Sequence, residues 1–439
     1  MAQQVVIIGG DAAGMSAAGQ IRRRQPDWTV RVLEKGHYTS YGACGIPYYF
    51  AGDVKEIDDL VVVSPEEFRT KRGIDVRTGW EAVAVDTAAK TVSARSESSA
   101  EESLAYDRLL IASGASAIVP PWPGIDLEAV VPLRNLADTR RVEQLLAGQP
   151  KRCVIVGGGY IGLEMAEAFA RRGLAVTLVE KLGGLMGGVC PKVTELAGRE
   201  LAAQGIELRL STTVQGFSGS DGRLTVVETD QGAIECDLAL IALGVRPNSR
   251  FAEQAGIPLG AGGAIAVDDH QRTGVADVYA AGDCAEAFHL VLGKPTYIPL
   301  ALTANRQGRV AGANMAGGYE RFPGIVGSAV TRVFDLTIAR VGIDEETARR
   351  EGIPYRAVET TAPSKAHYFV RHMPLWVQLL FRTDNRRVIG GWLVGKDESA
   401  GKRGDILATA ITAGMTVEQV SDRSTPTPAP SRCWSPWWV

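Results

Sequence analysis

The sequence contains few of the residues that build metal sites or disulfide frameworks. It has six cysteines and five histidines in 439 residues. No two cysteines form a Cys-x-x-Cys pair, and no His/Cys cluster has zinc spacing, so we expect no structural metal. The cysteines are Cys44, Cys153, Cys190, Cys236, Cys284 and Cys433. Cys153 and Cys236 lie in or beside apolar runs, which is typical of small buried side chains.

The sequence also lacks long apolar runs and a positive net charge. No segment approaches the roughly 18 continuous apolar residues of a membrane helix, and the first residues lack the basic and apolar stretches of a signal peptide. The formal net charge is -3, which provides no global attraction for nucleic acid or an anionic membrane. We therefore expect a cytoplasmic protein that binds neither.

The composition that is present is that of a globular protein with large cores. Hydrophobic residues make up 45% of the chain and charged residues 22%, which argues against a disordered or fibrous chain. The length suggests about three domains of roughly 150 residues each.

Two segments have the pattern of a strand, a helix and a second strand. In each, a β-branched apolar run ends in a glycine turn, an amphipathic helix follows, and strand character then returns. The predicted elements are residues 5–8, 12–24 and 29–33 in the first segment, and 153–156, 160–172 and 175–179 in the second. Two such units predict two nucleotide sites.

The remaining segments differ in character. Residues 76–93 alternate apolar and polar side chains and predict antiparallel strands, while residues 109–112 and 238–242 read as buried strands. From residue 325 onward no glycine-rich phosphate turn occurs, which predicts a separate α+β domain that serves an interface. Residues 421–439 are rich in proline and tryptophan, and we assign them no structure.

The second glycine turn is a full G-x-G-x-x-G motif formed by Gly157, Gly159 and Gly162. Between a strand and a helix, this motif brings the backbone and the helix N-terminal amides to a pyrophosphate. Glu180 ends the next strand, where a carboxylate accepts hydrogen bonds from a ribose 2′-hydroxyl and repels a 2′-phosphate. The sequence therefore favours NADH, and NADPH stays open because Lys181 follows.

The first glycine turn departs from the motif, because Asp11 stands where the middle glycine belongs between Gly9 and Gly14. Glu34 at the end of the second strand nevertheless matches Glu180 of the other unit. Far along the chain, a third apolar strand ends in Gly282-Asp283. Each segment alone is compatible with an ordinary turn, but the ordered set predicts a second dinucleotide site.

Over residues 5–419 the chain resembles the pyridine nucleotide-disulfide oxidoreductases, with Gly114 and Gly244 similar to the family's two crossover motifs. The resemblance implies an α/β fold with a discontinuous FAD-binding domain (1–112 and 246–322), an NAD(P)-binding domain (113–245) and a dimerisation domain (323–439) of a homodimer. The cofactor-binding residues it implies are Gly9, Asp11, Ala12, Ala13, Gly14, Glu34, Lys35, Ser40, Val83, Ala112, Ser113, Gly114, Gly157, Gly159, Tyr160, Ile161, Gly162, Glu180, Gly244, Gly282, Asp283, Pro299, Leu300 and Ala301.

The branch of the family is indicated by residues 40–50, where Cys44 stands alone and Tyr49 occupies the position of a second cysteine. The segment resembles the branch that contains CoA-disulfide reductase, persulfide reductase, NADH oxidase and NADH peroxidase. In that branch one cysteine cycles between a thiolate and an oxidised form beside the flavin. Cys44, followed by Gly45 and Pro47 at an expected helix start, fits a thiolate stabilised by helix N-terminal amides.

Further resemblances narrow the range of candidate substrates. Peroxide-reducing relatives carry a histidine where this chain has Ala12, so peroxide is disfavoured. Positions that hold coenzyme A in the CoA-disulfide and persulfide members correspond here to Ser16, Gln20, Arg23, Ser40 and Arg72. For the arginines, a solvated helix end that interacts with the helix dipole is the alternative interpretation.

Four side chains are candidates for chemistry under this resemblance. Cys44 is the redox centre, and Tyr368 is similar to a tyrosine that acts across the dimer interface, with an interface packing role as the alternative. Tyr160 resembles a gate over the flavin, and Glu164, one turn later, faces it; ordinary packing is an equal alternative for both. A second family tyrosine is missing from residues 425–430, and the change of composition after residue 421 suggests a shifted reading frame.

We therefore predict an NADH- and FAD-dependent reductase of low-molecular-weight disulfides or persulfides, with CoA disulfide or CoA persulfide as the predicted substrate. Oxygen reduction at the flavin, as in an NADH oxidase, is the enzymatic alternative. An electron-transfer or redox-sensing flavoprotein that depends on a protein partner is the alternative from another class.

Overall fold

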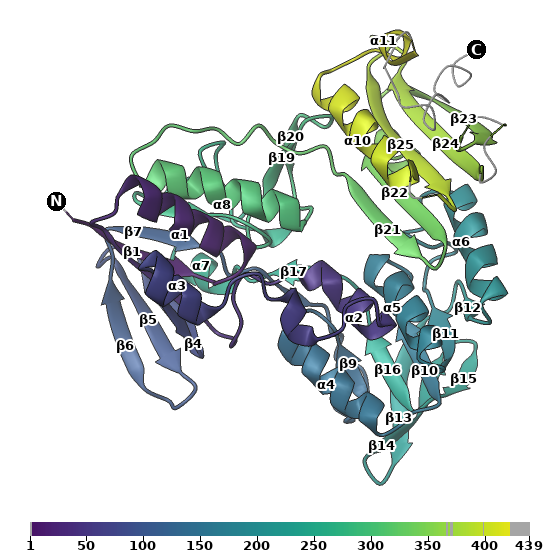
Figure 1. Cartoon of the computed structure of the whole chain (residues 1–439), viewed down its shortest axis with the longest axis horizontal. Helices are drawn as coiled ribbons and strands as arrows, with labels where there is room; N and C mark the ends of the chain where they lie inside the picture. The colour runs from purple at the N-terminus through teal and green to yellow at the C-terminus, as the bar shows by residue number, and fades with distance from the viewer. Residues whose placement is uncertain (1, 366–367, 369–371, 398, 422–439) are drawn as a thin grey trace.

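The computed structural model describes residues 2–365, 368, 372–397 and 399–421 of the chain. Three five-stranded sheets organise these residues, and each lies in a separate part of the molecule (Figure 1). The tail after residue 421, where the second family tyrosine and the reading-frame change were considered, lies outside the described residues.

The first sheet is parallel and has the order β18-β7-β1-β2-β3. Helices α1, α3 and α8 cover one face, and a three-stranded antiparallel sheet, β4-β5-β6, covers the other. The elements are β1 (Gln4–Ile8), α1 (Ala12–Arg24), β2 (Thr29–Glu34), α3 (Pro65–Arg72), β3 (Asp75–Thr78), β4 (Trp80–Asp86), β5 (Thr91–Ser96), β6 (Glu101–Ala105), β7 (Arg108–Ile111), β18 (Val278–Ala280) and α8 (Ala301–Met315).

The second sheet is also parallel and has the order β12-β11-β10-β16-β9. Helices α4, α5 and α6 pack on one face, and the antiparallel sheet β13-β14-β15 packs on the other. The elements are β9 (Val130–Pro132), α4 (Leu136–Ala147), β10 (Arg152–Val156), α5 (Tyr160–Arg171), β11 (Ala175–Val179), α6 (Pro191–Ala203), β12 (Glu207–Arg209), β13 (Val214–Ser220), β14 (Arg223–Thr229), β15 (Gly232–Glu235) and β16 (Leu238–Ile241).

A two-stranded antiparallel ribbon marks the place where the chain passes to the second sheet and returns. Its strands are β8 (Ala115–Ala117) and β17 (Val245–Pro247), which follow β7 and β16. Short elements complete the region of the first sheet: α7 (Arg250–Gln254), η3 (Ala261–Gly263), β19 (Ala287–His289) and β20 (Lys294–Thr296).

The third sheet is antiparallel, with the order β21-β22-β25-β24-β23. Helix α10 packs across β22 and β25, so one face of the sheet is covered from within the chain. The elements are β21 (Ala329–Val333), β22 (Leu336–Gly342), α9 (Glu345–Arg350), β23 (Tyr355–Pro363), β24 (Pro374–Arg382), β25 (Val388–Gly395), α10 (Ser399–Thr412) and α11 (Val417–Ser421).

Most predicted elements are confirmed, as are the α/β fold class and the α+β composition of the last part. One prediction is wrong in part: residues 76–78 belong to β3, which pairs in parallel with β2. The physical reason is the connection, because α3 intervenes and returns the chain to run in the same direction as β2. The antiparallel strands start later, at Trp80.

Helix α2 (Ile46–Ala51) lies far from the other early elements. In Figure 1 it sits beside α5, next to the second sheet, although the chain around it belongs to the first. Ile46, Tyr49 and Phe50 are buried in one cluster with side chains of α5 and of the third sheet. The short 3-10 turn η1 (Ala43–Gly45) precedes α2, and a second one, η2 (Ile57–Leu60), follows it.

Helices α1 and α8 approach each other closely through glycine. A Cβ atom added at Gly308 would lie 2.2 Å from the carbonyl oxygen of Ala13, and one added at Gly312 would lie 2.5 Å from that of Ala17. Neither neighbour is a flexible side chain, so the backbones themselves set the spacing of the two helices.

We expect Gly308→Ala to lower the free energy of unfolding by about 1 to 3 kcal/mol, because the added methyl group must push two helix backbones apart. Gly198→Ala in α6 is the matched control, since its Cβ would have its nearest neighbour at 3.5 Å, on the Leu208 side chain. That substitution should leave stability unchanged or raise it slightly. Denaturant unfolding of both variants measures the difference, and equal midpoints would contradict the close helix contact.

Candidate functional site

The first glycine turn, between β1 and α1, is built by backbone contact. Gly9 has φ +105°, and a Cβ atom there would lie 2.1 Å from the carbonyl oxygen of Ala112. A Cβ atom on Gly14 would lie 1.9 Å from the carbonyl oxygen of Gly9. The Asp11 side chain does not cap α1, so the first amides of the helix remain available to an anion.

The second glycine turn, between β10 and α5, repeats this construction. Gly157 has φ +113° and would bring a Cβ to 2.4 Å from the carbonyl oxygen of Ala242, and Gly162 would bring one to 1.9 Å from that of Gly157. The N-cap of α5 is Gly159, so no side chain caps this helix either. Both turns fit the pyrophosphate of a dinucleotide, because only glycine permits these approaches.

A carboxylate stands beside each turn in the same way. The Gly10 amide donates to Glu34 Oε2 at 2.7 Å, and the Gly158 amide donates to Glu180 Oε2 at 2.7 Å. The other oxygen of Glu34, Oε1, accepts from the Gly36 amide at 2.7 Å. In the same way, Glu180 Oε1 accepts from the Leu182 amide at 2.8 Å. Both carboxylates are thereby fixed at the position where the motif places a ribose.

Opposite the first turn, Asp283 follows β18 and pairs with an arginine that sequence reasoning missed. Arg134 lies between β9 and α4 and donates to Asp283 Oδ2 at 2.6 Å. Burial raises the pKa of Asp283, and the Arg134 charge opposes the rise. The sequence signalled a helix start after Arg134, through the capping residues Asn135 and Asp138, but not the direction of its side chain.

Asp11 lies close to the same charges. Its Oδ1 atom accepts from the Tyr41 amide at 3.2 Å. Burial raises the pKa of Asp11 to about 6, with further increases from Glu34 and Asp283, while the Tyr41 amide and Arg134 lower it. The aspartate that replaces the motif glycine therefore ties the first turn to the segment that leads to Cys44.

Cys44 lies in the turn η1, directly before α2. The turn is held to the neighbouring segment by backbone hydrogen bonds from Gly42 to the Leu60 carbonyl at 2.8 Å and from Val62 to the Ser40 carbonyl at 2.9 Å. Gly45 allows the Leu60 side chain to pack on the turn, since a Cβ there would lie 2.4 Å from Leu60 Cδ2.

Exposure separates Cys44 from the other cysteines among the described residues. Cys44 is exposed, whereas Cys153, Cys190, Cys236 and Cys284 are buried and unpaired. The expectation that Cys153 and Cys236 are buried side chains is confirmed.

The surroundings of Cys44 raise the pKa of its thiol, although the residue is exposed; stabilisation of the thiolate by helix N-terminal amides stays a prediction. Burial raises the pKa of the thiol, the Glu164 carboxylate raises it further, and Arg134 lowers it by less.

Glu164 lies one turn after Tyr160 on α5 and faces the third sheet. Its Oε1 atom accepts from the Thr331 hydroxyl at 2.7 Å. Burial raises the pKa of Glu164 to about 7, and the nearby Glu167 adds to the rise, while Thr331 and Arg332 oppose it. Burial also raises the pKa of Tyr160. Tyr160 and Glu164 therefore lie together on α5, and the Glu164 charge reaches Cys44.

The start of α8 adjoins the Gly282 turn. Gly282 has φ +84°, and its amide donates to Gln307 Oε1 at 2.9 Å. Pro299, Leu300 and Ala301 precede or begin α8, which has no side-chain cap at Leu300.

The other predicted positions lie around these turns. Val83 occupies a bulge of β4, because Ala82 and Ala84 pair with adjacent residues of β5. Lys35 pairs with Glu81 at 2.9 Å. Ala112 and Ser113 follow β7 and precede Gly114, and Gly244 precedes β17; Gly114 and Gly244 have φ +68° and +91°.

The residues assigned to coenzyme A lie on α1, α3 and the cysteine segment. Ser16 donates to Asn305 Oδ1 on α8 at 2.9 Å, a partner that the sequence did not reveal. Arg72 stacks on the Phe68 ring at 4.9 Å and lies 3.4 Å from Glu67. Gln20 is half-buried and Arg23 is exposed on α1, and Ser40 has φ +50°.

Tyr368 is 64% exposed. Residues 366–367 and 369–371 around it lie outside the described residues, so its placement toward a second subunit stays a prediction.

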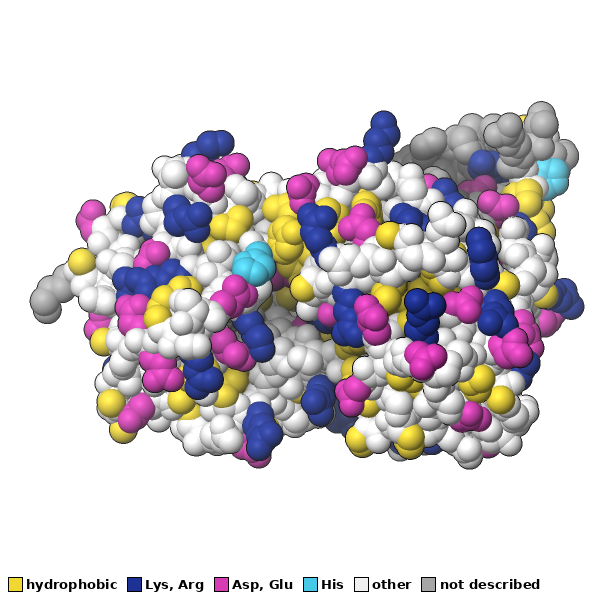
Figure 2. Space-filling view, turned by 90° about the horizontal axis from the view of Figure 1, so that it is seen from below, with side chains coloured by type: hydrophobic (Ala, Val, Ile, Leu, Met, Phe, Trp, Pro, Cys, Tyr) yellow, Lys and Arg dark blue, Asp and Glu magenta, His cyan; other side chains and the backbone are white. Residues whose placement is uncertain are grey.

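Other classes of site find no support in the part of the chain that the structure describes. No group of His, Cys, Asp or Glu there has the arrangement of a metal site. None of the helices in the same residues is both long and apolar enough to cross a membrane. On the face drawn in Figure 2, acidic and basic described side chains are interspersed rather than gathered by sign.

Comparison with known proteins agrees with this geometry. The family model of the pyridine nucleotide-disulphide oxidoreductases matches residues 3–308, and the model of that family's dimerisation domain matches residues 328–435. The NAD(P)H coenzyme A polysulfide/persulfide reductase of Pyrococcus horikoshii is 36% identical over 95% of this chain and 93% of its own. The coenzyme A disulfide reductase of Staphylococcus aureus strain COL is 31% identical over 95% of this chain and 94% of its own.

Among solved structures, an NAD-dependent persulfide reductase from A. fulgidus has a TM-score of 0.94 and 37% identity, covering 98% of this chain and 80% of that one. The similarity spans both glycine turns, the Cys44 segment and the third sheet. This chain belongs to the pyridine nucleotide-disulphide oxidoreductase family.

Proposed function

We propose that the protein uses NADH and bound FAD to reduce a low-molecular-weight disulfide or persulfide, with Cys44 as the redox centre. Coenzyme A disulfide and coenzyme A persulfide are the proposed substrates. The observation that carries the proposal is an exposed cysteine, Cys44, whose segment is tied through Asp11 to one dinucleotide turn and packs through α2 on the helix of the other. The names of the relatives support the same chemistry.

FAD is assigned to the first turn. Gly9, Gly14 and the α1 amides would hold the pyrophosphate, Glu34 the adenine ribose, and Asp283 the ribityl chain. FAD supplies a ring that accepts a hydride from the nicotinamide and passes an electron pair to sulfur. The remaining predicted cofactor residues, and the division into domains 1–112 with 246–322, 113–245 and 323–439, are part of this proposal.

The nicotinamide dinucleotide is assigned to the second turn, with NADH preferred. Both oxygens of Glu180 already accept backbone amides, so its negative charge is fixed where the 2′-phosphate of NADPH would lie. Lys181 is exposed beside it and is the residue that would attract that phosphate.

The sulfur chemistry requires the Cys44 thiolate. The thiolate attacks one sulfur of the substrate disulfide, a mixed disulfide forms on Cys44, and the first thiol leaves. Cleavage of this mixed disulfide would need an electron pair, which NADH would supply by way of bound FAD; the second thiol would then leave and the Cys44 thiolate would be restored. One NADH and one proton are consumed for each disulfide, and two thiols are produced.

The coenzyme A moiety is assigned to Ser16, Gln20, Arg23, Ser40 and Arg72. Arg23 is exposed and the Arg72 guanidinium lies on the protein surface, as a site for phosphates requires. We further propose that the protein is a cytoplasmic homodimer and that Tyr368 acts across the subunit interface.

Glu164 gives the thiolate step its pH dependence. Its carboxylate opposes ionisation of Cys44, and because its own pKa is about 7, protonation of Glu164 at lower pH removes that opposing charge. Glu164 and Cys44 therefore cannot both ionise without mutual repulsion.

Anaerobic titration with NADH should consume more than the two electrons that FAD accepts, because oxidised Cys44 accepts a further pair. Cys44→Ser should remove the excess and leave flavin reduction intact. Absorbance of the flavin against added NADH measures the stoichiometry. A wild-type endpoint at two electrons would show that Cys44 is not a redox centre.

Steady-state oxidation of NADH should be fast with CoA disulfide or CoA persulfide and slow with peroxide and with oxygen. Each acceptor is assayed separately, with Cys44→Ser as the control that should fall to background with the thiol substrates. Fast turnover with oxygen in both forms would identify an oxidase. Slow turnover with every acceptor would point to a partner-dependent electron carrier.

Glu164→Gln should lower the apparent pKa of Cys44, since the amide keeps the size of the side chain and removes the negative charge. Alkylation of Cys44 by iodoacetamide should therefore become severalfold faster at neutral pH. Rates measured across pH for both forms give the two pKa values. Glu195→Gln, on the exposed surface of α6 and paired with Lys192, is the control and should leave the profile unchanged.

A further inference from the structure

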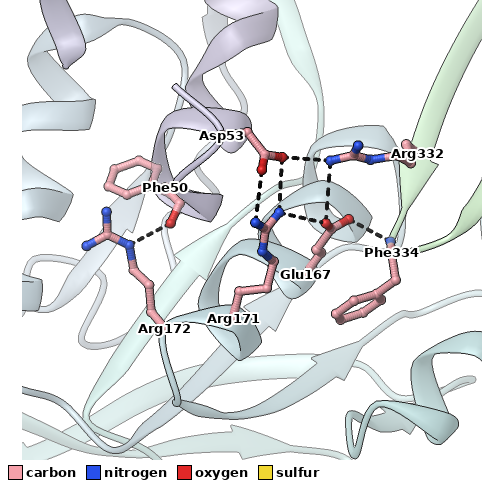
Figure 3. Close-up of polar contacts among 7 residues, drawn as sticks. All are labelled: Phe50, Asp53, Glu167, Arg171, Arg172, Arg332 and Phe334. Carbon is pink, nitrogen blue, oxygen red and sulfur yellow. Dashed lines mark hydrogen bonds and ion pairs between the residues drawn. The ribbon is translucent and has the colours of Figure 1, made fainter. Parts of the chain in front are cut away.

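Four charged side chains form a cluster where three parts of the chain meet (Figure 3). We call the cluster the clasp; its members are Asp53, which follows α2, Glu167 and Arg171 on α5, and Arg332 on β21. Arg171 binds Asp53 through two parallel hydrogen bonds of 2.9 and 3.0 Å, and Arg332 binds the same carboxylate at 2.8 Å.

Glu167 supplies the second anion of the clasp. Its side chain is 7% exposed and lies 3.3 Å from Arg171 and 3.7 Å from Arg332. Its other oxygen accepts from the Phe334 amide at 2.6 Å, which fixes the turn after β21. Two carboxylates and two guanidinium groups thus alternate, and a network of this kind holds its geometry better than an isolated surface ion pair.

The clasp holds the far end of α2. Arg172 directly follows α5 as its C-cap; its Nε atom donates to the Phe50 carbonyl at 2.6 Å, and its guanidinium stacks on the Phe50 ring at 5.5 Å. The carbonyl group near the end of α2 is therefore satisfied by α5, and the helix ends in a left-handed Gly52.

Arg332 also reaches the part of α2 nearest to Cys44. Its Cζ atom lies 5.3 Å from the centre of the Tyr48 ring, one helical turn after Cys44. Burial raises the pKa of Tyr48, Glu164 raises it further, Arg332 lowers it, and Cys44 itself raises it. Tyr48 is therefore in contact with Arg332 and within reach of the charge on Cys44. Arg332 Nε is buried without a hydrogen-bond partner, so Asp53, Glu167 and the ring hold the guanidinium.

We propose that Arg332 is a positioning residue for Cys44, through which the third sheet fixes the cysteine segment; this rests on the proposed role of Cys44 as the redox centre. A helix of six residues has no stability of its own. The direction of α2 is therefore set by its contacts with Arg332, with Arg172 and, through Asp53, with the clasp. Electron transfer to sulfur depends on placement within a fraction of an ångström, because a shift of about 1 Å can cost roughly 100-fold in rate.

Arg332→Met tests the proposal in the FAD-loaded protein. Reduction of the flavin by NADH and the KM for NADH should stay at the wild-type level, while kcat with CoA disulfide should fall roughly 10- to 100-fold. The long-wavelength absorbance band between the Cys44 thiolate and the oxidised flavin should weaken. Alkylation of Cys44 by iodoacetamide should become severalfold faster, since α2 loses its hold and the sulfur becomes more exposed.

Arg386→Met is the matched control. Arg386 also stacks on an aromatic ring, that of Phe381 at 4.5 Å, and pairs with Glu418 at 2.6 Å. It lies in the same sheet region but does not contact α2. This variant should lose a similar amount of stability. It should keep the wild-type flavin reduction, kcat with CoA disulfide, long-wavelength absorbance band and rate of Cys44 alkylation.

Arg332→Lys and Asp53→Asn complete the design. Lysine keeps the charge but cannot form the planar fork or stack equally on Tyr48, so it should restore kcat in part. Asp53→Asn removes the anion at the α2 end and should act like Arg332→Met, and it replaces that variant if Arg332→Met does not fold.

The proposal would be overturned if both Arg332→Met and Asp53→Asn kept the wild-type kcat, the wild-type long-wavelength absorbance band and the wild-type rate of Cys44 alkylation. Equal losses in Arg386→Met would also overturn it, because the effect would then be general destabilisation. Failure of the proposed function is a separate result: in that case the wild-type protein itself would take up two electrons and show no thiolate band.

Discussion

Contact of backbone with backbone at the two glycine turns is the constraint on which the arrangement of the molecule depends. At Gly14 and Gly162 the start of a helix touches the end of the preceding strand at a distance that no side chain allows. Each contact fixes the direction of the amides at the start of the helix. It also fixes the position of the turn relative to the carboxylate at or just after the end of the next strand, Glu34 or Glu180. The same local geometry occurs twice in the chain, and in both places it suits the pyrophosphate of a dinucleotide.

The segment of Cys44 is tied to the first turn through Asp11, and the helix after it packs on α5, which follows the second turn. The turn that contains Cys44 packs on Leu60 through Gly45. Burial raises the pKa of the Cys44 thiol most, the Glu164 carboxylate from α5 raises it further, and Arg134 from the segment before α4 lowers it. The balance is against the thiolate in the protein alone. Because Glu164 has a pKa of about 7, modest changes in its protonation alter that balance within the physiological range.

Local pattern predicted the repeated elements well. The first helix was expected over residues 12–24 and spans Ala12–Arg24, since apolar periodicity and a glycine turn define its limits. The direction of β3 was missed because it depends on a crossover, and the effect of Glu164 on Cys44 could not be read from local pattern because the two residues are far apart in the chain. Arg134, Asn305 and the clasp went unrecognised for the same reason: periodicity shows which face a side chain occupies, not which distant residue it meets.

The position of α2 has a consequence for how this molecule can be recombined. The helix follows Cys44 in the chain that forms the first sheet, yet its apolar face packs with α5 and β21, and the Phe50 carbonyl near its end accepts from Arg172. Exchange of the segment between β8 and β17 for that of another family member would therefore replace α5, and with it the residues that contact α2 after Cys44. A chimaera built at that ribbon inherits working nucleotide turns from both parents, but its sulfur keeps its alignment only if the donor helix presents equivalents of Glu167, Arg171 and Arg172.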